Sequence, residues 1–209
     1  MFQTIRGNVE AEITEKKSKF ICHAFHVESA SEAEEILKNL RKKYHDARHN
    51  CFAYKIIKDD ISRASDDGEP SGTAGIPMLN ILNGRNLSNV LVVVTRYFGG
   101  ILLGTGGLVR AYSLATTMAL DSASIVQQAL GLEAKFFVDY KDLEELRYIL
   151  KNRGIAITKM DYGEKVEVIV ESDEDKIRKI ENEKISDRFV LDNFEILCEK
   201  YVCVADSEN

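Results

Sequence analysis

The feature that most constrains the fold is a short aliphatic run that leads directly into a glycine-rich stretch. Residues 90–97 read VLVVVTRY, and five glycines follow between positions 99 and 107. A continuous apolar run of this length is typical of a strand buried on both faces, and it is far too short to cross a bilayer. The amphipathic stretch at 108–124 then predicts a long helix, so this part of the chain is expected to form a strand, a turn and a helix.

The remainder of the first half predicts further strands and two more helices. Residues 9–13, 20–25 and 51–57 are rich in residues that favour strands. A helix is predicted at 31–44, because Ser31 and Glu34 have the spacing of a capping box ahead of an apolar stripe. A shorter helix is predicted at about 76–82. The first half therefore combines a sheet with helices.

The second half has a simpler order of elements. Strands are predicted at 133–139, 155–161, 165–171 and 194–204, with helices at 142–152 and from 172 onward. The order β-α-β-β-α-β is that of a ferredoxin-like domain. We therefore predict an α+β protein with a first domain at residues 1–130, a ferredoxin-like domain at 131–205 and a tail at 206–209.

Charge is divided unevenly between the two halves. The net charge of the chain is −6, of which residues 1–130 contribute +1 and residues 131–209 contribute −7. An acidic second half does not suit a phosphate backbone, so any contact with nucleic acid is expected in the first half. No CxxC pair occurs among the four cysteines, and the first twenty residues carry charges without an apolar segment. These features favour a reduced, cytoplasmic protein with no signal peptide and no membrane partner.

The glycine-rich turn is a candidate anion-binding site. Glycine allows backbone N–H groups to approach a ligand closely, and the N-terminus of a helix carries a partial positive charge. Gly104 is followed by Thr105, so the turn is not a Walker A motif. Close packing of the strand against the helix, with the arginines paired to carboxylates, is the alternative interpretation. The candidate anion-binding residues are Arg96, Gly99, Gly100, Gly104, Gly106, Gly107 and Arg110.

The acidic stretch at residues 66–75, DDGEPSGTAG, permits three interpretations: a sharp turn, a metal loop or part of an active site. It lacks the alternating ligands of an EF-hand. A magnesium ion held by one or two carboxylates together with a bound phosphate stays open as a cofactor, and no other cofactor is predicted. The candidate cleft residues are His49, Asp66, Asp67, Glu69, Ser71 and Thr73.

The histidine pair of this region does not predict a metal site. His45 and His49 have the spacing of the zinc motif H-E-x-x-H, which requires both imidazoles on one face of a helix. The preceding helix is expected to end near Tyr44, and a strand is expected to start near Cys51. We therefore predict no metal site and assign no catalytic residue, and His49 is expected as a polar contact in a cleft.

Three strings taken together resemble the YigZ/IMPACT family. They are H-x-x-x-H-N-C-F-A-Y, S-D-D-G-E-P-S-G-T-A-G-x-P and V-V-V-T-R-Y-F-G-G-x-x-L-G-x-G-G-L-V-R-A-Y, and they fill residues 48–112 densely. The resemblance implies a first domain with the ribosomal protein S5 domain 2-like fold. It also implies a second, ferredoxin-like domain similar to one in the ribosomal translocase. Eukaryotic members regulate translation during amino-acid starvation by competing for an activator of a stress kinase.

The resemblance implies a non-catalytic binding or regulatory protein that acts in translation. The implied partners are the ribosome, RNA or a translation-regulatory protein. Because the first domain is nearly neutral, binding to ribosomes or RNA is expected to be weak and sensitive to salt. The two longest strings are expected to meet in one cleft.

The alternative function is an enzyme that acts on a small molecule or phosphoester. Its cleft would combine the three acidic residues of the acidic stretch with Arg96 and Arg110. Some bacterial members carry a proline-dipeptidase label, but such an enzyme requires clustered metal ligands that this sequence does not predict.

Overall fold

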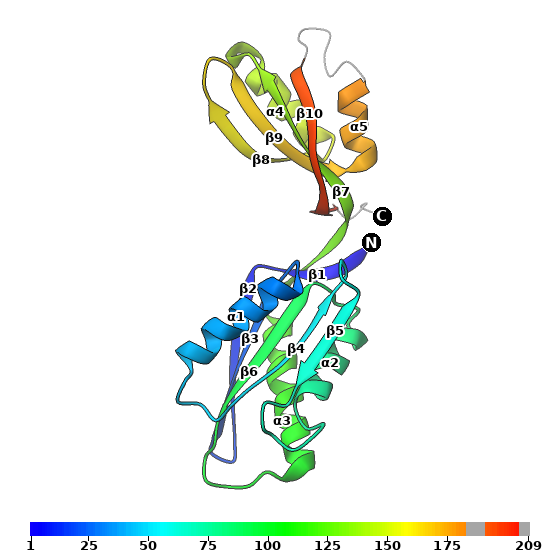
Figure 1. Ribbon diagram of the computed structural model, residues 1–209. Coiled ribbons are helices and arrows are strands. Elements are labelled where there is room, and N and C mark those ends of the chain that lie inside the picture. Colours follow the sequence, from blue (N-terminus) through cyan, green and yellow to red (C-terminus); the bar gives the residue numbers. More distant parts are fainter. Residues whose placement is uncertain (183–190, 205–209) are drawn as a thin grey trace. The chain divides into compact units, whose positions relative to one another are not determined.

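The computed structural model describes residues 1–182 and 191–204 and divides into two compact units (Figure 1). The first unit runs from Phe2 to Val126, and the second begins at Gln127 and also takes in Met1. The division therefore lies within strand β7 (Ser124–Val138), a few residues before the predicted boundary at 130. The predicted tail at 206–209 lies outside the described residues. No helix in the described ranges has the length and hydropathy needed to span a membrane.

The sheet of the first unit has five antiparallel strands in the order β2-β3-β6-β4-β5. The apolar run is the central strand β6, and its residues are buried as far as Arg96, which confirms the predicted buried strand. Strand β5 was not predicted, because it is a short, polar edge strand without an apolar pattern. The strand bounds are β2 (Asn8–Glu15), β3 (Ser18–His26), β4 (His49–Ile56), β5 (Ile61–Ser65) and β6 (Val90–Tyr97).

Helices cover both faces of this sheet, as Figure 1 shows. Helix α1 (Ala30–Lys43) packs on one face, and helices α2 (Gly75–Gly84) and α3 (Gly104–Asp121) pack on the other. Successive side chains of β6 alternate between the two cores: Val92 and Val94 contact the α2 and α3 side, and Leu91 and Val93 the α1 side. A strand buried on both faces needs an unbroken apolar run, which accounts for the sequence of β6.

Two predicted helix starts were wrong. Helix α1 is capped by Ser29, whose Oγ accepts a hydrogen bond from the backbone N–H of Glu32 at 3.2 Å, and not by Ser31. Both serines are followed by a glutamate three positions later, so the pattern alone did not distinguish them. Helix α3 begins at Gly104, four residues before the predicted start at Leu108. Its first turn therefore contains three of the glycines, and Arg110 lies one turn further along than predicted.

The second unit has the predicted ferredoxin-like order of elements and strands. Its sheet runs β10-β7-β9-β8, and each of these neighbouring pairs is antiparallel. Strand β1 (Phe2–Arg6), which was not predicted and belongs to the first unit, pairs with β7, the strand within which the division lies. The α+β fold class is thus confirmed. The remaining bounds are η1 (Tyr140–Asp142), α4 (Leu143–Asn152), β8 (Ala156–Tyr162), β9 (Val166–Asp173), α5 (Glu174–Asn182) and β10 (Asp192–Cys203).

Candidate functional site

The acidic stretch forms a tight turn that directs Glu69 into the first unit. The two central residues, Asp67 and Gly68, have positive φ angles of 41° and 86°. The backbone N–H of Glu69 donates to the carbonyl oxygen of Asp66 at 2.9 Å, which closes the turn. Positive φ at both central positions marks a type I′ turn, for which Asp-Gly is a favoured pair. The sequence D-D-G-E is therefore a turn whose last residue is buried.

The carboxylate of Asp66 holds the start of helix α2. Its Oδ1 accepts hydrogen bonds from the backbone N–H groups of Ala74 and Gly75, both at 2.9 Å, and its Oδ2 accepts one from Gly72 at 2.8 Å. Burial acts to raise the pKa of Asp66, but the N–H donors of Gly72, Gly75 and Ala74 outweigh it and lower that pKa. Ala74 offers no side-chain cap, so Asp66 takes over this role from eight residues away.

The Asp67 side chain connects the same turn to helix α1 and strand β4 by hydrogen bonds. Its Oδ1 accepts from Arg41 Nη2 at 3.0 Å, and its Oδ2 accepts from the backbone N–H of Asn50 at 2.7 Å. The carboxylates of Asp66 and Asp67 therefore have separate partners and do not converge with that of Glu69. Over residues 1–182 and 191–204, no three His, Cys, Asp or Glu side chains are grouped as metal ligands.

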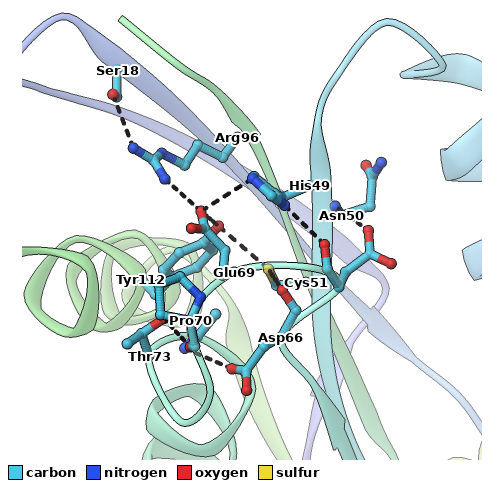
Figure 2. A network of polar contacts seen from close by, with 12 residues as sticks. Ser18, His49, Asn50, Cys51, Asp66, Glu69, Pro70, Thr73, Arg96 and Tyr112 are labelled. Carbon is cyan, nitrogen blue, oxygen red and sulfur yellow. Dashed lines mark hydrogen bonds and ion pairs between the residues drawn. The ribbon is translucent and has the colours of Figure 1, made fainter. Parts of the chain in front are cut away.

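A buried ion pair lies at the centre of the site (Figure 2). Arg96 Nη1 donates to Glu69 Oε1 at 2.6 Å, and these side chains are only 6% and 3% exposed. The Tyr112 hydroxyl donates to the same oxygen at 2.8 Å. The guanidinium of Arg96 also lies over the rings of Phe20 and Phe98, at 5.4 and 5.6 Å from their centroids. Strand β6, helix α3 and the acidic turn are joined at this point.

The Tyr112 hydroxyl and the Cys51 thiol, both beside this ion pair, stay protonated at neutral pH. Burial raises the pKa of the Tyr112 hydroxyl, and Cys51 and Glu69 act in the same direction. Burial likewise raises the pKa of the Cys51 thiol, whose Sγ lies 2.9 Å from the carbonyl oxygen of Asp66. A thiolate is the nucleophilic form of cysteine, so Cys51 is not poised for nucleophilic attack. These groups serve to fix the position of Glu69.

A cavity of about 350 Å³ opens above this ion pair. Its lining includes the polar side chains of Arg48, His49, Glu69 and Arg96. Leu102 is 84% exposed and Phe98 is 45% exposed, so the rim presents apolar groups to solvent. The rest of the lining is Pro70, Phe98, Leu102, Leu103, Gly104, Thr105 and Leu108. The acidic stretch and the glycine-rich turn both contribute to this one cavity.

His49 is held in a defined orientation. Its Nδ1 lies 2.8 Å from the carbonyl oxygen of Asp67, and a carbonyl oxygen only accepts, so Nδ1 carries the proton. Its Nε2 lies 4.0 Å from Glu69 Oε1 (Figure 2). In the neutral imidazole, Nε2 is therefore an acceptor, on the side of the ring that faces Glu69.

The other residues predicted for the anion site lie apart from the cavity lining. A Cβ on Gly99 would overlap the carbonyl group of Lys17, so this glycine serves close packing of the loop against the hairpin between β2 and β3. Gly100 has a φ of 85° and is exposed, and Gly107 packs against Leu103. Arg110 lines a separate depression together with Glu15 and Lys16, outside the cavity above the ion pair. Of the seven predicted anion-site residues, Arg96 and Gly104 line that cavity.

Only some of the predicted cleft residues line the cavity. His49 and Glu69 line the cavity, Ser71 is exposed on the surface, and the Thr73 hydroxyl donates to the carbonyl oxygen of Pro70 at 2.6 Å. Arg48 and Tyr112 were not predicted as site residues. Tyr112 lies four residues after Leu108 and hence on the same face of α3, a spacing that identifies it once the helix is known. No pattern in the sequence singled out Arg48.

Replacing Asp66 by Asn is expected to destabilise the protein by about 2 kcal/mol near neutral pH, because three backbone N–H groups lose a charged acceptor. The pKa of Asp66 is lowered in the folded state, so its contribution is present above about pH 4 and is lost as the pH falls through the folded pKa. Urea denaturation near pH 7 and at lower pH measures both effects. Asp59→Asn, at an exposed turn position, is the control. Equal stability of Asp66→Asn and the unchanged protein at neutral pH would contradict the assignment.

Comparison with known proteins follows the division of the fold. A profile described as Impact N-terminal domain matches residues 16–120, half of the chain, and one described as Domain of unknown function (DUF1949) matches residues 136–185. IMPACT family member YvyE of Bacillus subtilis (strain 168) is 42% identical over 165 residues, which are 78% of this chain and 76% of the relative. IMPACT family member YigZ of Escherichia coli (strain K12) is 38% identical over 150 residues, or 70% of this chain and 74% of the relative.

A solved structure supports the same relationship. It is described as the crystal structure of an hypothetical protein, and it is 34% identical to this chain with a TM-score of 0.60. The match covers 81% of this chain and 84% of the solved one. Both the sequence and the two-domain arrangement of elements are therefore shared with known proteins. The chain belongs to the IMPACT family.

Proposed function

We propose that this protein regulates translation by binding a partner through the cavity of its first domain. The observation that carries the proposal is the contrast between the floor and the rim of that cavity. The floor is a buried, paired Glu69–Arg96 contact, whereas the rim exposes Leu102 and Phe98 to solvent. Exposed apolar groups beside a cavity are typical of a surface that a partner covers. Membership of the IMPACT family, whose eukaryotic members regulate translation, supports the role in translation.

The charge of the first domain bears on how such a partner would be held. Five of its fifteen basic side chains are paired with carboxylates, among them Lys19 with Glu12 at 2.6 Å and Arg41 with Asp67 at 3.0 Å. Because residues 1–130 carry a net charge of only +1, contact with a ribosome or RNA would be weak and salt-sensitive. A protein partner that covers the apolar rim needs no such surplus of charge.

A cell-free translation reaction tests the proposed function. Adding the full-length protein is expected to change the rate of protein synthesis in a dose-dependent way. The double variant Arg48→Ala, Leu102→Ser is expected to lose this effect, because both positions are exposed at the cavity and their replacement does not disturb the core. The control is Lys58→Ala, an exposed basic position outside the cavity. No change in rate at any protein concentration, or an undiminished effect of the double variant, would overturn the proposal.

One observation favours an enzyme that acts on phosphoesters as a second candidate. His49 is fixed by Asp67 as the tautomer whose free Nε2 can accept a proton, which is how a general base is oriented. Release of inorganic phosphate from a panel of phosphomonoesters tests this candidate. If the protein is such an enzyme, His49→Gln is expected to abolish phosphate release. His45→Gln, at an exposed turn position, is the control and is expected to leave the rate unchanged. Phosphate release at the background rate for the whole panel would remove it.

A further inference from the structure

We infer that the cavity of the first domain binds an anionic oxygen group that carries a branched aliphatic group. The inference names the ligand chemistry of the site and rests on the proposed function for its biological role. An acidic peptide in which a carboxylate lies beside a leucine-like side chain has this chemistry. A small organic phosphate with a branched aliphatic group has it too. Three features of the cavity lead to it: an unpaired arginine, the start of a helix and an aliphatic wall.

The charged groups around the cavity leave one positive charge unpaired. Arg96 is neutralised by Glu69 in the floor. Arg48 lines the same cavity and is exposed, and it has no hydrogen-bond or ion-pair partner among the described residues. An exposed guanidinium at a cavity is free to form a charge-assisted hydrogen bond to a carboxylate or phosphate oxygen.

Helix α3 begins at the same cavity. Gly104 and Thr105, its first two residues, line the cavity, and Leu103 at the N-cap provides no side-chain hydrogen bond. The first N–H groups of a helix lack intrahelical partners, and an 18-residue helix carries a partial positive charge at this end. Gly104 has a φ of 72° and open space where a Cβ would lie, so the backbone at this end is accessible to a ligand.

The buried arginine of the floor offers no further donor to a ligand. Arg96 is 5% exposed and paired with Glu69, and its Nε, which has no hydrogen-bond partner within the described part of the chain, is shielded from solvent. An anionic oxygen in the cavity would therefore be held by Arg48 and by the first N–H groups of α3.

The apolar wall determines the rest of the ligand. Leu102, Leu103 and Leu108 line the cavity from the loop and the first turns of α3, and Pro70 adds to them from the acidic turn. A volume of about 350 Å³ is at the lower end of the range for ligand pockets and exceeds what a bare inorganic anion fills. Aliphatic side chains along the wall suit a branched hydrocarbon group of the ligand.

Four small probes test this inference on the full-length protein. N-acetyl-leucine and isopentyl phosphate carry an anionic group and an aliphatic group, N-acetyl-leucinamide has only the aliphatic group, and acetate has only the anion. We expect N-acetyl-leucine, isopentyl phosphate or both to shift the backbone amide resonances of Gly104 and Thr105 in a saturable way. At the same concentrations, N-acetyl-leucinamide and acetate are expected to cause no saturable shift. Stronger binding of N-acetyl-leucine would indicate a peptide carboxylate, and stronger binding of isopentyl phosphate a phosphoester.

Variants identify the groups responsible. Arg48→Ala is expected to weaken binding of the amphiphilic anions by about tenfold, the usual effect of removing one charged hydrogen-bond partner. Leu102→Ser is expected to weaken them as well, while Lys58→Ala, at an exposed basic site outside the cavity, leaves binding unchanged. Equal binding of the neutral amide, unchanged binding by Arg48→Ala, or no saturable shift with either amphiphilic anion would overturn the inference.

The two proposals fail in different ways. If the double variant Arg48→Ala, Leu102→Ser loses its effect on translation while neither amphiphilic anion binds, the proposed function stands and the ligand inference falls. If an amphiphilic anion binds and Arg48→Ala weakens it, but the protein does not alter translation, the ligand inference stands and the role in translation falls.

Discussion

Replacing Glu69 by Gln is expected to lower the free energy of unfolding by about 3 kcal/mol or more. The Glu69–Arg96 pair is buried on both sides, so removing the carboxylate charge leaves the guanidinium in a poorly solvated site without a counter-charge. The Tyr112 hydroxyl also loses a charged acceptor. Urea denaturation of the full-length protein, monitored by circular dichroism, measures the change.

Two further variants isolate the ion pair as the cause. Glu35→Gln removes a carboxylate at an exposed position of α1 and is expected to change stability by less than about 0.5 kcal/mol. The double variant Glu69→Gln, Arg96→Met removes both charges and is expected to be more stable than Glu69→Gln alone, because no unpaired charge stays buried. If Glu69→Gln were as stable as the unchanged protein, the pair would not join β6, α3 and the acidic turn as described.

Replacing Gly99 by Ala is expected to destabilise the protein by about 3 kcal/mol or more. A methyl group here would overlap the backbone carbonyl of Lys17 and the backbone nitrogen of Ser18, and neither is able to move without shifting the hairpin between β2 and β3. The hydrogen bond from the Gly99 N–H to Ser18 Oγ, 3.1 Å long, would also be strained. Thermal unfolding of the full-length protein measures the effect.

Gly106→Ala is the matched control for this change. A Cβ at Gly106 would meet only the end of the Arg110 side chain at 3.7 Å, an ordinary contact. Because this residue lies in the first turn of α3, alanine is expected to be neutral or to stabilise the protein by up to about 1 kcal/mol. A similar loss of stability for both variants would contradict the distinction between a packing glycine and a freely exposed one.

Elements with a strong apolar period were predictable from the sequence. The central strand β6 and the β-α-β-β-α-β order of the second unit follow from runs and spacings that few other structures accommodate. The start of α3 was not predictable, because its first turn is made of glycines, which disfavour helix in an isolated sequence. The start of α3 depends on the packing of Leu108 and Tyr112 in the core of the first unit. This tertiary packing cannot be read from the local sequence.

The two stretches of sequence that form the site were predictable, but the hydrogen-bond and ion-pair partners of their side chains were not. The residue types in the acidic stretch and the glycine-rich turn indicated a functional surface. The partners depended on long-range geometry: Asp66 bonds to the start of α2, Asp67 to Arg41, and Glu69 to Arg96. Three neighbouring carboxylates were therefore assigned to one cleft, although the positive φ angles at positions 67 and 68 turn them in different directions. Arg48 was missed because an exposed arginine has no pattern until the fold brings it to a cavity.

A photo-crosslinking experiment tests whether the partner binds at the cavity of the first domain. A benzophenone amino acid is placed at Leu102, 84% exposed at the cavity rim, or at Tyr148, 69% exposed in the second unit. Each full-length protein is irradiated in a translation-active extract, and nuclease treatment separates protein from RNA partners. We expect a discrete crosslinked product from position 102 that Arg48→Ala reduces, and none from position 148. A product from position 148 alone, or one from position 102 that Arg48→Ala leaves unchanged, would contradict this expectation.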